Sequence, residues 1–483
     1  MNTAGRLLWP CITALVALTT IGAVAQERPD RTRPPALGPA PGLTVPSIQK
    51  RALSNGIPVW VVESREVPLV QVNLLVLGGS GDDPVGKFGV ASLTAGMLDE
   101  GAGNRSSLQI ADEVEFLGAT LAATSSFDAS AVRLNVPVAR LDAALNVMAD
   151  VAIRPTFPET DLERVRRERL TSLLQARDDP ESIVPLAFQR LVFGATHRYG
   201  TSATGSEASV ARLTRDDLLA FHRQWYQPSS SRFVVVGNIS ADAAVAQLQR
   251  AFGAWTGPAA VARTRVSEAP QIASTRIFIV DHPDAAQSQI RIGNVGVSRA
   301  APDFFALEVL NAILGGSFTS RLNQNLREEH QYTYGAASRF DMRLSAGPFV
   351  AAAGVQTDKT AEALREFMKE LTAMSAPVPA DELARARNYL ALGFPADFET
   401  TRDLAVRLEE LIIYGLPDDY HSRYVANIQA VTVGEVQAAA RAHILTNRLA
   451  IVIVGDRKTI EPGIRALNIA PVQTMTVEEA LGL

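Results

Sequence analysis

Hydrophobic and polar positions follow two different periodicities along the chain, beginning near Arg51. Short runs rich in branched residues, such as 57–62 and 70–76, are typical of strands. Apolar residues recur with helical spacing in other stretches, such as 141–152 and 161–177. Strand and helix patterns alternate, so the sequence predicts a mixed α+β fold.

One pattern occurs twice, which bears on domain organisation. In the first half, Thr214 opens a helical pattern that is followed by a strand-like run ending at Gly237. In the second half, Thr432 and Gly455 repeat this order at the same interval, and each threonine stands at a predicted helix N-cap. The repeat predicts two homologous α/β-sandwich domains, which we assign to residues 48–257 and 275–475, joined by a proline-broken linker at 258–274.

The N-terminal stretch has the composition of an export signal. Residues 1–25 carry one charge, Arg6, then an apolar run, and end in Ala-Val-Ala, which predicts a secretory signal peptide rather than a membrane anchor. We therefore expect a periplasmic protein with no membrane span after cleavage. Residues 26–47 are rich in proline and predict an extended tether. The only cysteine, Cys11, lies inside the signal, so the mature chain would have no disulfide.

Composition narrows the range of partners. The 483 residues are 47% hydrophobic and 20% charged, with a formal net charge of −5. Acidic residues interrupt every basic stretch, so no nucleic-acid partner is expected.

Residues 79–101 (GSGDDPVGKFGVASLTAGMLDEG) resemble the segment that carries the zinc motif in pitrilysin/insulinase metallopeptidases. The resemblance continues through further segments of both halves, namely Leu117-Gly-Ala, His197-Arg-Tyr-Gly, 221–228 and 314–338. It identifies the chain as a member of this inverzincin family, similar to a two-domain processing-peptidase subunit. Active members carry H-x-x-E-H, in which two histidines one helical turn apart bind zinc and the glutamate acts as general base.

The positions that match this motif carry other residues. They are Ser92, Ala95 and Gly96, and neither Ala95 nor Gly96 has a group that binds metal or moves a proton. The family's third ligand, a glutamate, aligns near Thr171 and Ser172, so it is missing too. No two of the six histidines are close enough in sequence to form a helical ligand pair, although ligands can still converge in space. We expect no metal in this chain.

In the second half, the segment 326–334 resembles a family segment with functional residues, and those residues are present here. Arg327 and, seven positions later, Tyr334 match an arginine and a tyrosine that hold the substrate backbone and the oxyanion in active relatives. Tyr332 competes with Tyr334, because the family usually has Gly-Leu where this chain has Gln331-Tyr332. Read without the family, Arg327 beside two glutamates is typical of a solvated helix. Gly315 and Gly316 fit either a tight helix-to-loop turn, which we favour, or a flexible substrate contact.

The resemblance implies a role in peptide hydrolysis that depends on a partner. The leading hypothesis is the non-zinc-binding subunit of a heterodimeric zinc metallopeptidase, whose homologous partner carries H-x-x-E-H and the zinc. The substrate would be a peptide or an unfolded polypeptide. The alternative is a catalytically inactive peptide-binding or scaffold protein. A peptidase with another nucleophile ranks last, because the chain has no G-x-S-x-G motif and no catalytic cysteine.

Overall fold

Two six-stranded sheets form the centre of the protein. The computed structural model describes residues 46–258, 263 and 265–483, so the expected signal peptide (1–25) and nearly all of the tether (26–47) lie outside the described residues. The first sheet has the strand order β1-β2-β8-β3-β7-β6. Its strands are β1 (Gln49–Ala52), β2 (Pro58–Glu63), β8 (Ser231–Gly237), β3 (Leu69–Val76), β7 (Ser130–Pro137) and β6 (Thr120–Ser125).

The second sheet repeats this arrangement in the C-terminal half for five of its six strands. Its order is β11-β12-β10-β13-β9-β14. The strands are β11 (Thr333–Phe340), β12 (Pro348–Gln356), β10 (Gln287–Val295), β13 (Ala450–Gly455), β9 (Arg276–Asp281) and β14 (Val472–Met475). In each sheet the last of the repeated strands, β8 or β13, pairs parallel with the first, β2 or β9, and antiparallel with β3 or β10. The predicted α+β class and two-half architecture are thereby confirmed.

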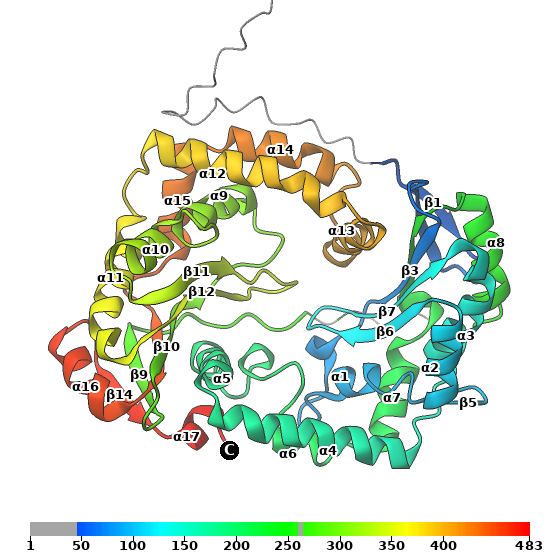
Figure 1. The fold of residues 1–483 in the computed structure, drawn as a ribbon, viewed down its shortest axis with the longest axis horizontal. Helices are drawn as coiled ribbons and strands as arrows, with labels where there is room; N and C mark the ends of the chain where they lie inside the picture. The colour runs from blue at the N-terminus through cyan, green and yellow to red at the C-terminus, as the bar shows by residue number, and fades with distance from the viewer. Residues whose placement is uncertain (1–45, 259–262, 264) are drawn as a thin grey trace, which may run out of the picture. The chain divides into compact units, whose positions relative to one another are not determined.

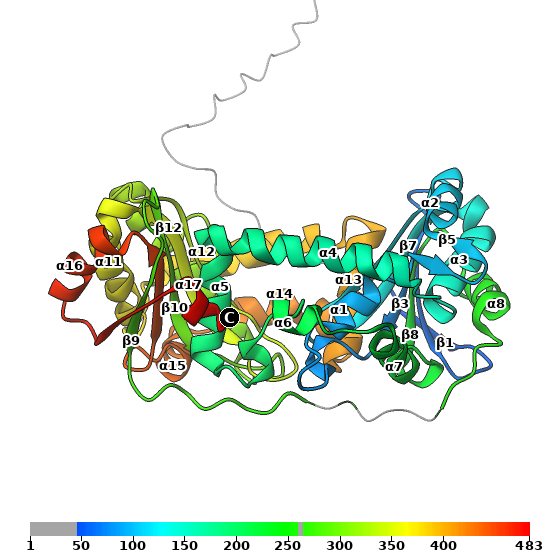
Figure 2. The same cartoon turned by 90° about the horizontal axis from the view of Figure 1, so that it is seen from below.

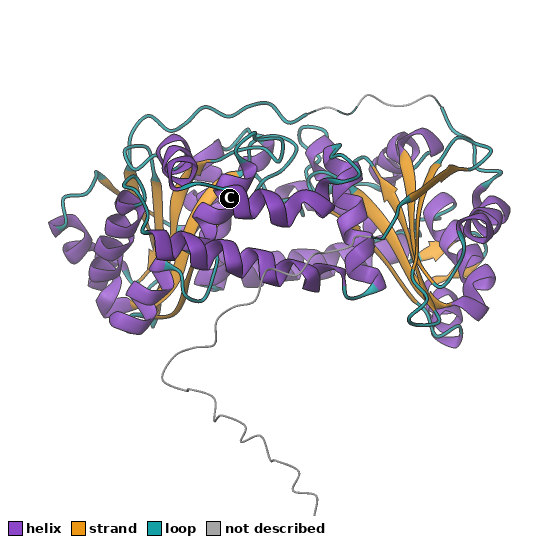
Figure 3. Ribbon diagram, turned by 90° about the horizontal axis from the view of Figure 1, so that it is seen from above, coloured by secondary structure: helices purple, strands orange, loops and turns teal. Residues whose placement is uncertain are grey.

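Helices make up most of the rest of the described chain (Figures 1 and 3). Those of the N-terminal half are α1 (Val90–Ala95), α2 (Ser107–Phe116), α3 (Leu141–Ile153), α4 (Glu159–Gln175), α5 (Pro180–Phe193), α6 (Glu207–Val210), α7 (Arg215–Trp225) and α8 (Ala241–Phe252). A short hairpin, β4 (Gly101–Ala102) and β5 (Arg105–Ser106), precedes α2. Those of the C-terminal half are α9 (Phe304–Leu314), α10 (Arg321–Asn323), α11 (Thr360–Ala373), α12 (Ala380–Gly393), α13 (Thr401–Tyr414), α14 (Tyr420–Ala430), α15 (Val433–His443), α16 (Arg457–Ala466) and α17 (Val477–Leu481).

The repeated threonines act as the sequence predicts. The side chain of Thr214 accepts a hydrogen bond from the backbone N–H of Asp217 and caps α7. Thr432 caps α15 in the same way, through the N–H of Glu435. In both caps the acidic side chain also bonds back to the threonine, which makes each a capping box.

Each sheet is covered on one face by a helix from the other half. Helix α13 packs Leu404, Leu408 and Leu411 onto Val234 and Val236 of the first sheet. Its Glu409 is 3% exposed and accepts hydrogen bonds of 2.6 to 3.1 Å from Asn73 and Arg133 of that sheet. Figure 1 shows α13 beside the β3 side of this sheet.

Helix α5 makes the reciprocal contact with the second sheet. Ile183, Val184 and Phe188 pack against strand residues that include Val280 and Val452. The two halves therefore exchange one covering helix each, and residues Ala40–Leu483 form one compact unit. None of the helices in the described residues has the length and apolar character that crossing a membrane requires.

Candidate functional site

Helix α1, which carries the positions of the zinc motif, is held at its start by a buried ion pair. The Asp83 carboxylate accepts hydrogen bonds from the backbone N–H groups of Gly89 (2.7 Å) and Ala91 (3.0 Å). Arg198 donates to the same carboxylate at 2.9 Å, and both side chains are buried. Sequence reasoning did not assign either residue, although Arg198 belongs to the His197-Arg-Tyr-Gly segment that it noted. The pair fixes where α1 begins.

The three motif positions lie together on α1. Gly96 ends the helix, and its N–H donates to the carbonyl of Ser92 at 3.1 Å, one turn earlier. Ala95 is 1% exposed, so its methyl group is part of the core. The helix keeps the geometry that the family motif requires, but its side chains cannot ligate zinc.

An arginine occupies the place beside Gly96. A Cβ atom at position 96 would lie 3.8 Å from Nη2 of Arg169, which comes from α4. Burial lowers the pKa of this guanidinium, and its Nη1 atom is buried without a hydrogen-bond partner. Thr171 and Ser172, where the sequence places the third ligand, are exposed, and the Ser172 hydroxyl donates to the carbonyl of Glu168 at 3.0 Å. The side chain that faces α1 is thus the cation Arg169, which sequence reasoning missed.

Zinc does not fit the residues at this place. A zinc ion needs three or four nitrogen, sulfur or carboxylate ligands, whereas α1 and α4 present a hydroxyl, a methyl group, a glycine and a guanidinium. Within the part of the chain that the structure describes, no group of three or more His, Cys, Asp or Glu side chains could hold a metal ion. Five of the histidines bond a carbonyl or carboxylate instead, namely His197, His222, His282, His421 and His443.

Arg327 lies on an irregular turn of helix. Residues Gln324–Glu329 follow α10 directly and form a π-helix, a conformation that is frequent at functional sites. The guanidinium lies over the Phe318 ring, 4.8 Å from its centroid, and its Nε is 3.1 Å from the Glu328 carboxylate. Phe318 is 59% exposed, so this arginine and its aromatic partner face solvent together.

The structure separates the two candidate tyrosines. Pairing between β11 and β12 is interrupted between Thr333 and Ala336, and the Thr333 hydroxyl donates to the Gly354 carbonyl at 2.6 Å. Tyr334 lies in this bulge and is 88% exposed. Tyr332 is half-buried and stacks on His330 with ring centroids 5.0 Å apart. Tyr334 is therefore the tyrosine that is free to meet a ligand.

Gly315 and Gly316 form the turn that ends α9. Their N–H groups both donate to the carbonyl of Asn311, at 2.9 and 2.6 Å. A Cβ at Gly315 would lie 2.3 Å from the backbone nitrogen of Ser338 on β11, and one at Gly316 would lie 2.6 Å from the Asn311 amide. Close packing of the turn against its neighbours accounts for both glycines.

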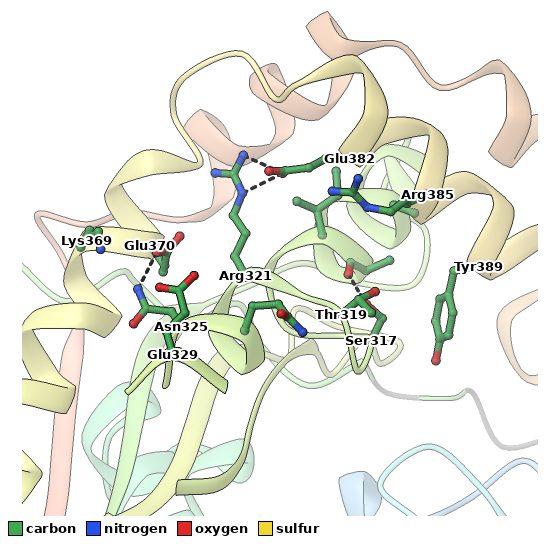
Figure 4. A pocket seen from close by; sticks show the side chains of 14 residues that line it. Ser317, Thr319, Arg321, Asn325, Glu329, Lys369, Glu370, Glu382, Arg385 and Tyr389 are labelled. Atoms are coloured by element: carbon green, nitrogen blue, oxygen red, sulfur yellow. Dashed lines mark hydrogen bonds and ion pairs between the residues drawn. The ribbon is translucent and has the colours of Figure 1, made fainter. Parts of the chain in front are cut away.

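A polar cavity of about 440 Å³ lies next to the π-helix (Figure 4). Arg321 reaches across it to Glu382 of α12 at 2.8 Å, and Asn325 donates to Glu370 of α11 at the same distance. Two other cations of its lining pair with carboxylates outside it, Lys369 with Glu366 and Arg385 with Asp381. The bond from Asn325 connects the π-helix to α11. No hydrogen bond or ion pair in the described residues joins Arg327 or Tyr334 to Ser92, Gly96 or Arg169.

Comparisons with known proteins match both halves of the chain. The family model described as Insulinase (Peptidase family M16) matches residues 59–198, and the model described as Peptidase M16 inactive domain matches residues 212–390. An uncharacterized zinc protease of Mycobacterium tuberculosis is 26% identical over 444 residues, which cover 90% of this chain and 99% of the relative. The protein named uncharacterized zinc protease YmxG of Bacillus subtilis is 24% identical over 60% of this chain and 69% of its own length.

Solved structures agree with these matches. A peptidase M16 inactive domain from Pseudomonas fluorescens superposes with a TM-score of 0.79 and 26% identity, covering 84% of this chain and 98% of that one. A protease from Helicobacter pylori has the same TM-score at 19% identity, covering 85% and 100%. The second likeness bears on the fold alone.

Proposed function

This chain belongs to the insulinase (M16) peptidase family, in which it fits a non-catalytic member, and we propose that it is the zinc-free subunit of a heterodimeric zinc peptidase. The partner would be a homologous subunit with an intact H-x-x-E-H motif, and the zinc would be held there. The export signal expected at residues 1–25 would bring this chain to the periplasm, where the partner would meet it.

One observation supports this proposal most directly. The zinc-motif positions on α1 and the pair of Arg327 and Tyr334 present different groups to a ligand. Position 96 is a glycine beside a cation, whereas Tyr334 is 88% exposed on a bulged edge strand. A side chain so exposed gains nothing from burial in its own chain, and it is free to reach a substrate held by another subunit. Arg327, on the π-helix, is the second candidate group, and it lies at the surface beside Phe318.

Zinc held by the partner would supply Lewis-acid chemistry and an activated water. The residues of this chain would bind and orient the substrate. The Tyr334 hydroxyl would donate a hydrogen bond to the oxyanion as it forms, and the Arg327 guanidinium would hold a backbone carbonyl of the substrate.

The fold also has edge strands with which an extended peptide can form backbone hydrogen bonds. β6 and β11 are edge strands of their sheets, and every second residue of β6 is exposed. An edge strand offers unpaired N–H and C=O groups, which an extended peptide can satisfy. This supports a peptide or an unfolded polypeptide as the ligand.

The second candidate function is a peptide-binding or scaffold protein without chemistry. The observation that favours it is that Arg327 already has partners in its own chain, Glu328 and Phe318. Such a protein would use the same edge strands but would need no partner with zinc.

A mild affinity purification from the native host separates the two functions. Co-purifying proteins are identified by mass spectrometry, and zinc is measured in the same sample. We expect a stoichiometric H-x-x-E-H relative and about one zinc per pair, since one such motif binds one ion. A lone, zinc-free chain would favour the scaffold function. Zinc in the lone chain would contradict both.

A further inference from the structure

Arg169 is an unpaired cation at the place where active relatives hold a metal. It makes no hydrogen bond and no ion pair with any residue in the described ranges, and its Nη1 atom is buried. Desolvating an unpaired charge is unfavourable, so a guanidinium in this position calls for an anionic partner.

Other arginines of the same helix have found such partners. Arg164 pairs with Glu100 and Glu168, and Arg166 pairs with Glu163. Arg166 also donates to the carbonyls of Val210 and Leu213. Arg169 differs from them, although it lies on the same long helix, α4 (Figure 2). Arg167, which is exposed, has no ion pair either, but it donates to the carbonyl of Glu163. Among the arginines of α4, Arg169 is the one with neither a hydrogen bond nor an ion pair within the described residues.

The position beside Arg169 is open to solvent. Gly96 is exposed and has no side chain, and a Cβ there would only make ordinary contacts of 3.5 to 3.8 Å, one of them with Nη2 of Arg169. Ser92, one turn earlier on α1, is half-buried, and its hydroxyl makes no hydrogen bond in the described residues. α1 packs against β6, one of the two edge strands of the first sheet. A peptide strand paired with β6 would run close to α1.

We propose that Arg169, with the Ser92 hydroxyl as a second donor, binds a carboxylate of a peptide that lies along β6. The guanidinium matches a carboxylate in shape, because its fork of N–H groups bonds both oxygens at once. The carboxylate would be the C-terminus of the peptide or an acidic side chain near it. The inference rests on the peptide binding proposed above, but it does not depend on a zinc-bearing partner.

The test is peptide binding by the isolated mature chain, followed by fluorescence anisotropy. Three N-terminally labelled peptides of alternating threonine and alanine are compared: a free C-terminal acid, the C-terminal amide, and the amide with a glutamate at the next-to-last position. We expect the acid to bind about 10- to 100-fold more tightly than the plain amide, as loss of a charge-assisted hydrogen-bond pair implies. If the glutamate amide binds as the acid does, the site takes any carboxylate, and if it binds as the plain amide does, the site requires a C-terminus.

Two variants assign the preference to Arg169. Arg169→Gln should bring the acid to the affinity of the amide, while Arg169→Lys should keep part of the difference. Arg167→Gln is the matched control, since Arg167 is an exposed arginine of the same helix, and it should leave the difference unchanged. Unfolding temperatures of all variants check the fold.

Equal affinities of acid and amide for the unchanged chain would overturn the proposal. An equal loss of the acid-over-amide preference in Arg167→Gln and Arg169→Gln would overturn it too. So would a dissociation constant of the acid weaker than about 1 mM, the value that corresponds to a binding free energy near −4 kcal/mol. None of these outcomes bears on the proposed roles of Arg327 and Tyr334, because those roles are measured as turnover in the presence of the zinc-bearing partner.

Discussion

The two halves of this protein share a scaffold but differ in the chemistry they present. Both arrange five of their six strands in the same order, and both have a threonine capping box at the corresponding helix and a covering helix from the other half. The sixth strand differs, because β1 pairs antiparallel with β2 and β14 pairs parallel with β9. The N-terminal half has lost its metal-binding groups from α1, and the C-terminal half has kept an arginine and an exposed tyrosine near β11. The scaffold is stabilised by apolar burial and caps that do not involve these groups, so the reactive residues of one half can change while the fold persists.

The largest expected effect concerns the exchanged helices. Leu408→Ala on α13 should lower the free energy of unfolding by about 2 to 5 kcal/mol, and Phe188→Ala on α5 by about 3 to 5 kcal/mol, because both side chains are buried against the other half's sheet. Denaturant unfolding of the isolated chain measures both. Val406→Ala, on α13 but 41% exposed, is the control and should change stability by less than about 0.5 kcal/mol. A loss in only one of the two buried variants would mean that the exchange stabilises the halves unequally.

The next effect is on catalysis. In the reconstituted pair, Tyr334→Phe should lower turnover by about 10²-fold or more, as removal of one oxyanion donor does. Peptide hydrolysis at saturating substrate measures it, and Tyr332→Phe is the matched control, because Tyr332 is stacked on His330. If Tyr332→Phe causes the loss and Tyr334→Phe does not, the roles of the two tyrosines are exchanged. If both are silent, neither acts in the mechanism.

A smaller effect compares the two halves directly. Thr214→Ala and Thr432→Ala remove equivalent caps, so each should cost about 1 kcal/mol of unfolding free energy. Both caps are exposed, and each is one capping box at the start of a helix of 11 residues. Denaturation curves of the two variants should therefore shift alike. A variant with an unchanged free energy of unfolding would show that its helix begins to unfold before the rest of the chain.

The features that the sequence predicts correctly are those that depend on residues close together in the chain. The two threonine caps and the strand-like runs at 57–62 and 70–76 depend on neighbouring residues, and the structure confirms them. The exchange of α5 and α13 was not predictable in this way. The apolar positions of α13 indicate that one face is buried, but Leu404 and Leu408 do not show which of two similar sheets they cover.

The candidate site shows the same limit. The loss of the motif at Ser92, Ala95 and Gly96 is visible in the sequence, since residue type alone decides it. The choice between Tyr332 and Tyr334 was not, because it depends on a bulge that Thr333 and its bond to Gly354 create across two strands. Arg169 could not be predicted, because nothing in the sequence of α4 distinguishes it from the neighbouring arginines, and its place beside Gly96 depends on how α4 and α1 come together in the fold.

The smallest expected effect is an absence of change. Rebuilding the motif as Ser92→His, Ala95→Glu and Gly96→His should leave the chain free of zinc, which elemental analysis of the purified variant measures. Two causes act together: the third carboxylate ligand is missing, and the guanidinium of Arg169 repels a divalent cation at the place where a histidine at position 96 would hold it. Adding Arg169→Gly to the three changes separates the causes. Zinc uptake by that variant would identify the cation as the obstacle, whereas continued absence would point to the missing ligand. Zinc bound by the triple variant itself would show that Arg169 moves aside easily, and the contrast between the two halves would then rest on the three residues of α1 alone.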